Sequence, residues 1–130
     1  MQKNLYTILL DNTIIGTTEL EKADAPMGVV FGQINFIDTT FGYDFFKKYC
    51  LTNRIQITYD YPDDKVITTA YISNLKVLDQ NGIEIKGAGV NIEGMDSDIF
   101  TITILGVSYP FFEDEIPHHV KAYNDQFNNN

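Results

Sequence analysis

The sequence predicts an α+β fold, in which one mostly antiparallel sheet of about seven strands, curled or partly closed, packs against two short helices. Residues that favour strands, namely Ile, Val, Thr, Tyr and Phe, recur throughout the 130-residue chain, and they fit a pleated, half-buried surface. Short runs that alternate apolar and polar residues lie between turn sequences. Two other segments carry apolar residues at helical spacing. One follows the first strands and one ends the chain, which is an order expected of an α+β domain.

Three strands are expected before the first helix. Residues 11–13 have the composition of a turn, so the first two strands would form a hairpin. Pro26 and Gly28 then interrupt the pattern, because proline fixes φ and glycine accepts a positive φ. Gly32 lies inside the third strand, where a glycine indicates a bulge or a close approach of another backbone segment. The expected strands cover residues 4–10, 14–20 and 29–36.

The first helix is expected directly after the third strand. Asp38 or Thr39 can cap its N-terminus with a side-chain oxygen. Lys47 and Lys48 would fall in its last turn, where they complement the negative end of the helix dipole. The apolar residues that recur at helical spacing are Phe41, Phe45 and Tyr49. They predict a short helix with one aromatic face.

The middle of the chain returns to the strand pattern. Apolar and polar residues alternate over residues 54–60, which predicts a half-buried strand. Its expected apolar face consists of Ile55, Ile57 and Tyr59. Residues 61–65 have the composition of a turn. Residues 66–79 then form either one long bent strand or two strands.

A hairpin is expected around Asn81 and Gly82. These two residues favour the positive φ values that a type I′ turn requires, and the returning strand would cover residues 83–86. Residues 100–104 alternate again and form the last expected strand. Glycines indicate bends at residues 87–89 and 93–94.

A second helix is expected at residues 116–127. Its apolar stripe consists of Ile116, Val120, Tyr123 and Phe127. Pro117 suits the first helical position, and the carboxylates of Glu113–Glu115 complement the positive end of the dipole. Residues 128–130 are expected to fray. Because no linker interrupts the pattern, residues 1–130 are expected to form a single domain.

The charge balance constrains the partner. Nine basic residues face 18 acidic ones, which gives a formal net charge of −9. Proteins that follow nucleic-acid phosphates use Lys and Arg to replace counterions, and anionic membrane surfaces also attract basic segments. We therefore expect neither direct nucleic-acid binding nor membrane binding. A basic partner is favoured, although the charge would also serve solubility alone.

The compartment is inferred from short or missing signals. The apolar run at residues 5–10 is too short for a signal-peptide core, and no run reaches the length of a membrane span. Cys50 is the single cysteine, so no disulfide within the chain is expected. We expect a cytoplasmic protein in which Cys50 is a small buried apolar residue.

No catalytic or metal-binding motif is recognisable. The chain lacks Gly-x-Ser-x-Gly, His-Glu-x-x-His and Cys-x-x-Cys, so we expect a non-enzymatic protein without a cofactor. Asp96 and Asp98, together with Glu93, offer oxygen ligands but not the spacing of an EF-hand, so no metal site is expected. His118 and His119 are adjacent and point in different directions, and we expect them on the surface.

Two segments are candidate binding sites. Residues 87–130 contain seven acidic residues against one lysine, and aromatic residues beside them have the composition of an interface with a charged rim. The aromatic segment could equally lie beneath the final helix. The turn of Pro26, Met27 and Gly28 presents Met27 to a ligand or partner, or buries it in the core. The predicted partner-binding residues are Tyr109, Phe111, Phe112, Glu113, Asp114, Glu115, Asp96 and Asp98.

These observations predict an acidic protein-binding module. Its composition is shared by inhibitor and immunity proteins that block a basic enzyme such as a nuclease, although many unrelated domains share it too. Two alternatives stay open. One is a domain that binds a small molecule between a curled sheet and a helix, and the other is a self-assembling, homo-oligomeric accessory protein of the phage type.

Overall fold

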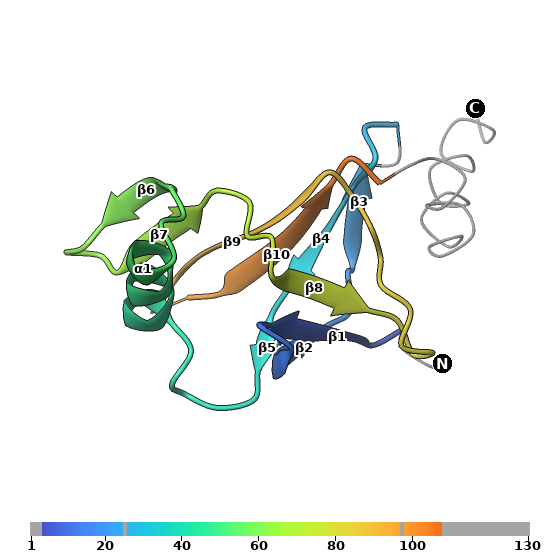
Figure 1. Ribbon diagram of the computed structural model, residues 1–130, viewed down its shortest axis with the longest axis horizontal. Helices are drawn as coiled ribbons and strands as arrows, with labels where there is room; N and C mark the ends of the chain where they lie inside the picture. The colour runs from blue at the N-terminus through green and yellow to red at the C-terminus, as the bar shows by residue number, and fades with distance from the viewer. Residues whose placement is uncertain (1–3, 25, 97, 108–130) are drawn as a thin grey trace.

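The computed structural model describes residues 4–24, 26–96 and 98–107, which form ten strands and one helix. Every strand pair in this part of the chain is antiparallel, which confirms a mostly antiparallel α+β arrangement (Figure 1). The elements are β1 (Tyr6–Leu10), β2 (Thr13–Thr18), β3 (Lys22–Asp24), β4 (Val29–Gln33), β5 (Asn35–Phe36), α1 (Tyr43–Thr52), β6 (Ile57–Tyr61), β7 (Val66–Thr69), β8 (Leu75–Leu78), β9 (Gly89–Met95) and β10 (Phe100–Leu105).

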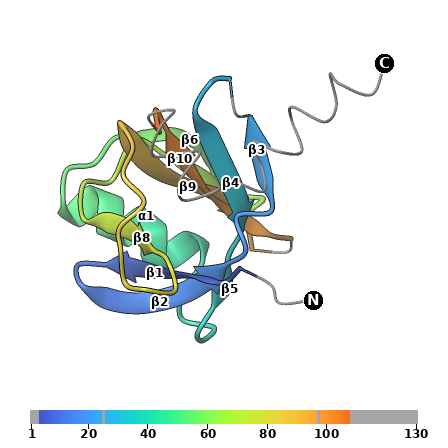
Figure 2. The same cartoon turned by 90° about the vertical axis from the view of Figure 1, so that its right-hand side faces the viewer.

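The strands form two sheets, so the prediction of about seven strands in one sheet was wrong. A four-stranded sheet has the order β5-β2-β1-β8, and a six-stranded sheet has the order β3-β4-β10-β9-β7-β6. Figures 1 and 2 show α1 and the four-stranded sheet on the same side of the six-stranded sheet. The core lies between these layers, where Ile8, Val77 and Ile102 are fully buried.

Two predicted segments are divided between the two sheets: residues 29–36, expected to be one strand, and residues 66–79, expected to be either one bent strand or two. Residues 29–36 break at Ile34, after which β5 pairs with β2 while β4 pairs with β10. Residues 66–79 divide in the same way, because β7 belongs to the six-stranded sheet and β8 to the four-stranded sheet. Strands that change sheets at a corner explain why one continuous apolar pattern contributes to two sheets.

The type I′ conformation occurs at the first hairpin. Asp11 and Asn12 both have positive φ, 51° and 64°, between the paired residues Leu10 and Thr13. In the hairpin expected around Asn81 and Gly82, only Gly82 has a positive φ. There the carboxylate of Asp79 accepts the N–H groups of Asn81 and Ile83 at 2.8 and 2.9 Å. The side chain organises a wider loop, and the predicted type I′ turn was wrong.

Other local expectations were also corrected. Residues 83–86 form an isolated bridge between Leu78 and Glu84 rather than a strand. Residues 93–94, expected to bend, lie within β9. Gly32 does mark a close approach, because a Cβ there would lie 2.5 Å from Oγ1 of Thr18 and 2.8 Å from Cα of Leu20.

The helix begins and ends later than expected. Asp38 and Thr39 precede it, since α1 begins at Tyr43 and ends at Thr52 with no basic residue in its last turn. Lys47 therefore lies in the middle of the helix. Cys50 is fully buried, as expected, and burial raises the pKa of its thiol to about 11.

The C-terminal expectations lie outside the described residues. They include the second helix at residues 116–127, the end of the chain at 128–130, and six of the predicted partner-binding residues. Within the described ranges, no helix is long and apolar enough to cross a membrane.

Candidate functional site

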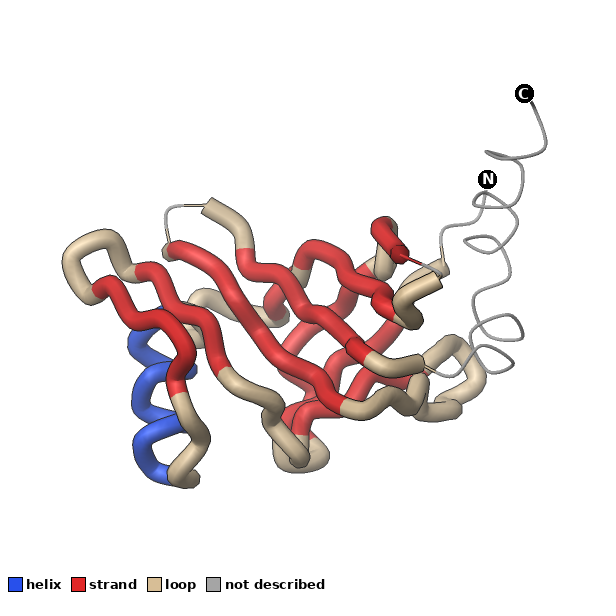
Figure 3. Tube along the Cα trace, turned by 90° about the horizontal axis from the view of Figure 1, so that it is seen from above, coloured by secondary structure: helices blue, strands red, loops and turns tan. Residues whose placement is uncertain are grey.

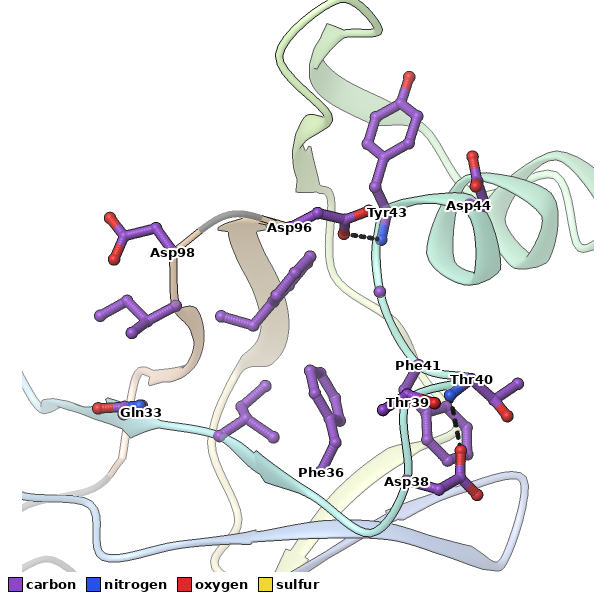
Figure 4. Close-up of a pocket in the computed structure, with 14 residues that line it drawn as sticks. Gln33, Phe36, Asp38, Thr39, Thr40, Phe41, Tyr43, Asp44, Asp96 and Asp98 are labelled. Carbon is purple, nitrogen blue, oxygen red and sulfur yellow. Dashed lines mark hydrogen bonds between the residues drawn. The ribbon is translucent and has the colours of Figure 1, made fainter.

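A cleft of about 580 Å³ opens at the N-terminal end of α1. Three segments that are distant in the sequence form it: the end of β4 with β5, the loop that leads into α1, and the loop between β9 and β10 (Figure 4). The lining residues are Gln33, Ile34, Phe36, Asp38, Thr39, Thr40, Phe41, Gly42, Tyr43, Asp44, Asp96, Asp98, Ile99 and Phe100.

The apolar part of the cleft is aromatic. Phe36 is the centre of the group, with ring centroids 5.9 Å from Phe41 and 5.6 Å from Phe100. Phe46 of α1 packs against Phe36 and Phe100 from within the core. These separations lie in the range at which aromatic rings attract one another. The rings therefore give the cleft a rigid apolar wall.

The polar part of the cleft is acidic. Asp38, Asp44, Asp96 and Asp98 line it, and no Lys or Arg is found among its described lining residues. Figure 4 shows Asp98 and Asp38 on opposite sides of the aromatic group. Clustered carboxylates with low-dielectric walls between them concentrate a negative potential. The cleft is therefore suited to a cationic group.

Two of the carboxylates support the local backbone. Asp96 Oδ1 accepts the N–H of Tyr43 at 2.7 Å, which satisfies one donor at the start of α1. Asp38 Oδ1 accepts the N–H of Thr40 at 2.7 Å, and hydrogen bonds from the Thr40 side chain and backbone lower the pKa of Asp38. Both side chains hold the loop in place, and the lowered pKa keeps Asp38 ionised at neutral pH.

The other two carboxylates differ in their contacts. Asp44 forms an exposed ion pair with Lys65, with 3.2 Å between Oδ1 and Nζ. Asp98 is exposed, and its backbone N–H donates to the carbonyl of Met95 at 2.9 Å. Among the described residues no side chain pairs with the Asp98 carboxylate. Asp98 is therefore the carboxylate best placed to meet an incoming cation.

A partly buried polar cluster of Tyr43, Lys47 and Asp60 holds α1 beside the cleft. Tyr43 is 2% exposed, and its hydroxyl donates to Asp60 Oδ1. Lys47 Nζ lies 3.1 Å from Asp60 Oδ2 and 3.2 Å from the Tyr43 hydroxyl. The cluster joins the first turn of the helix to β6, and so holds the residues on the α1 side of the cleft.

The cluster also perturbs the pKa of each member. Burial, followed by the hydrogen bond to Asp60, raises the pKa of Tyr43. The hydrogen bond from Tyr43 lowers the pKa of Asp60 against the smaller effect of desolvation. Hydrogen bonds to Tyr43 and Asp60 raise the pKa of Lys47. At neutral pH the cluster is thus a neutral phenol between a carboxylate and an ammonium group.

The predicted apolar face of the strand 54–60 was correct for Ile55 and Ile57, which pack half-buried against the core, and wrong for Tyr59. A register shift between Ile57 and Tyr59 adds an extra residue in β6, and such a bulge exchanges the two faces beyond it. Asp60 consequently faces α1, while Tyr59 is exposed. The signal that could have suggested the cluster is the spacing of Tyr43 and Lys47, which are four residues apart on one helical face.

The predicted site residues are only partly brought together. Asp96 and Asp98 both line the cleft, and the sequence prediction missed Asp44 and the aromatic wall. Pro26, Met27 and Gly28 form the β3–β4 turn and do not line it. Met27 is 68% exposed, which excludes its burial in the core. The predicted residues Tyr109, Phe111, Phe112, Glu113, Asp114 and Glu115 lie outside the described residues.

Comparisons of the chain with protein-family models, with curated proteins and with solved structures give no match. Among the described residues, no three His, Cys, Asp or Glu side chains are grouped so that they could hold a metal ion. The cleft is therefore interpreted from its own geometry and charge.

Proposed function

We propose that the chain is an acidic, non-enzymatic protein-binding module whose cleft receives a basic side chain of its partner. The observation that carries this proposal is the combination of four carboxylates with an aromatic wall and no basic lining residue among those described. Lysine and arginine side chains have an apolar stem and a cationic end. The stem would pack on Phe36 and Phe41, and the cationic end would meet Asp98.

The class of partner follows from the charge of both surfaces. A chain with a net charge of −9 attracts basic proteins over distances beyond direct contact. Basic enzymes that act on nucleic acids are one such class, and an acidic protein that covers their substrate groove would inhibit them. We therefore propose an inhibitor or immunity-type role in the cytoplasm, without a cofactor.

A cationic small molecule is the second candidate for the same cleft. Its volume of about 580 Å³ lies within the range of small-molecule pockets. A polyamine would satisfy the carboxylates in the same way as a lysine side chain. If the polyamine spermidine raised the melting temperature and the Asp98→Asn variant abolished that rise, this alternative would be favoured over a protein partner.

The test for a protein partner is capture of binding proteins on the immobilised chain at several salt concentrations. Asp98→Asn removes the charge of the Asp98 carboxylate and nearly keeps the shape of the side chain. We expect it to reduce retention of basic proteins, and we expect salt to reduce retention of the wild type in the same way. Asp24→Asn, at the exposed end of β3 on the sheet edge opposite β6, removes the same charge away from the cleft and is the matched control.

The outcomes separate the cleft from general charge. Equal loss of retention in both variants would mean that net charge alone attracts the proteins, and the cleft would have no special role. Retention that ignores salt and Asp98→Asn would contradict the proposed function. A concentration-dependent oligomer in light scattering would instead support the self-assembling alternative.

A further inference from the structure

The outer face of the six-stranded sheet is not covered by any described element. Figure 3 shows these strands facing the viewer, with the four-stranded sheet behind them. The register of β7, β9 and β10 places Thr68, Glu93 and Thr101 in one row across this face. All three side chains are at least partly exposed. In the part of the chain that the structure describes, this face is therefore open to a contact.

Two tyrosines stand together on this face, at its β6 edge. Tyr59 and Tyr61 alternate with Asp60, which faces α1, so they point outward. They are 56% and 54% exposed, and their rings are nearly parallel, with centroids 6.4 Å apart and planes at 8°. Parallel, exposed rings offer broad faces to a planar group.

The charge around the pair is negative. Glu93 lies in the same cross-strand row as Tyr59, and Asp63 and Asp64 are exposed in the turn that follows Tyr61. The strands β6, β7 and β9 contain no Lys or Arg. Lys65 of the turn directs its ammonium group toward Asp44 and the Tyr43 ring, on the other side of the sheet.

We propose that Tyr59 and Tyr61 form a stacking site for an arginine side chain of the basic partner, an inference that rests on the proposed function. A guanidinium group is planar, always charged and weakly hydrated, so it stacks on aromatic faces better than an ammonium group does. The two rings are nearly parallel and each is more than half exposed, so a guanidinium group can lie on an exposed ring face.

A second copy of the chain fits this surface less well. Its net charge of −9 would bring acidic surfaces together. An arginine-bearing partner instead places positive charge beside Glu93, Asp63 and Asp64. Charge complementarity therefore favours the basic partner as the occupant.

The test compares an oligoarginine peptide with an oligolysine peptide of equal length and charge. Both are titrated into the full-length chain by calorimetry, and the Tyr59 and Tyr61 ring resonances are followed by NMR. We expect tighter binding of the arginine peptide. Tyr59→Ala and Tyr61→Ala should each weaken it about two- to fivefold and leave the lysine peptide nearly unchanged.

Three variants control for the structural effects of these changes. Tyr59→Phe and Tyr61→Phe keep the ring faces, so they should keep the arginine preference. Tyr71→Ala removes a tyrosine that is 53% exposed, whose ring covers Gly89 and does not stack on another described tyrosine. It should leave the preference unchanged. Circular dichroism checks that each variant is folded.

Several results would overturn the proposal. Equal affinity for the two peptides, no binding of either, or unchanged binding by both alanine variants would each do so.

The same variants separate the tyrosine site from the cleft. If only Asp98→Asn weakened binding, the cleft would stand and the tyrosine site would fail. If only the tyrosine variants did, the tyrosine site would stand and the cleft would fail. A dimer lost in Tyr59→Ala would identify a second copy as the occupant. Changes in the Tyr59 and Tyr61 ring resonances of the Phe111→Ser variant would identify residues 108–130 as the occupant.

Discussion

Asp96 and Tyr43 are 53 positions apart in the sequence, yet the Asp96 carboxylate accepts the backbone N–H of Tyr43, the first residue of α1, at 2.7 Å. Gly42, the residue before the helix, has no side chain that could form such a bond. A Cβ at Gly42 would lie 2.9 Å from Asp96 Oδ1. The loop between β9 and β10 thus provides the cap that the helix does not have locally.

Loss of this distant cap should destabilise the protein. We expect Asp96→Ala to lower the free energy of unfolding by about 1 kcal/mol, the usual effect of removing a capping oxygen. Asp96→Asn keeps an acceptor and should lower it less. Urea denaturation measures both. Asp98→Ala, two residues away in an exposed position, is the control, and an equal loss there would argue against a capping role.

The cluster of Tyr43, Asp60 and Lys47 should make stability depend on pH in the acid range. The pKa of Asp60 is lowered below its ordinary value of 3.8, chiefly by the hydrogen bond from Tyr43. Its contribution to stability is therefore fully present above that value and is lost as the pH falls through the lower folded pKa. Asp60→Asn should make the acid part of the stability curve shallower. Tyr43→Phe should do so as well, because the donor is removed.

The same cluster should respond at high pH with the opposite sign. The pKa of Tyr43 is raised above 10.0, so its contribution is present below that value and is lost as the pH rises through the folded pKa. Denaturant midpoints across both ranges test the two effects. Asp63→Asn in the exposed turn should leave the pH dependence of stability unchanged in both the acid and the alkaline range. A wild-type curve that is flat in both ranges would contradict the assignment.

Gly32 should tolerate no side chain. A Cβ at this position would contact Oγ1 of Thr18 and Oε1 of Glu21 at 2.5 Å, and Cα of Leu20 at 2.8 Å. The backbone contact cannot be relieved by rotating a side chain. We therefore expect Gly32→Ala to cost about 1–3 kcal/mol, as overpacking usually does. Thermal unfolding measures this cost. An unchanged melting temperature would mean that the backbone at Leu20 moves away from Gly32 at little cost.

Cys50 should react slowly with thiol reagents in the folded protein. Burial raises its pKa from 9.0 to about 11, so the thiolate fraction near neutral pH falls by about a hundredfold. Alkylation by iodoacetamide should be at least that much slower than in urea. The control is Leu51→Cys in a Cys50→Ala background, because Leu51 is exposed on the same helix. Similar rates at the two positions would show that α1 opens readily.

Local sequence signals predicted the features that depend on neighbouring residues. Asp11 and Asn12 adopt positive φ in a tight hairpin, as their turn-forming side chains favour. The close approach at Gly32 and the burial of Cys50 were also predicted correctly. Each of these depends on the chemistry of one residue and its immediate surroundings.

Features that depend on the pairing of distant segments were not predicted. Ile34 continues the apolar pattern of β4, and nothing local indicates that the chain changes sheets there. The bulge before Tyr59 leaves no signal in the alternation, so Ile57 was placed on the correct face while the faces of Tyr59 and Asp60 were exchanged. Asp96 and Asp98 were predicted as binding residues from charge alone, but the cleft they share with Phe36 required the fold.

The division of one extended segment at Ile34 has a consequence for the order of folding. Because β4 and β5 are adjacent in the sequence but belong to different sheets, pairing of either strand brings the other strand close to its own sheet. Pairings of this kind join residues far apart in the chain, which slows folding. We therefore expect the two sheets to appear in a single kinetic phase, with no intermediate in which one sheet is complete alone.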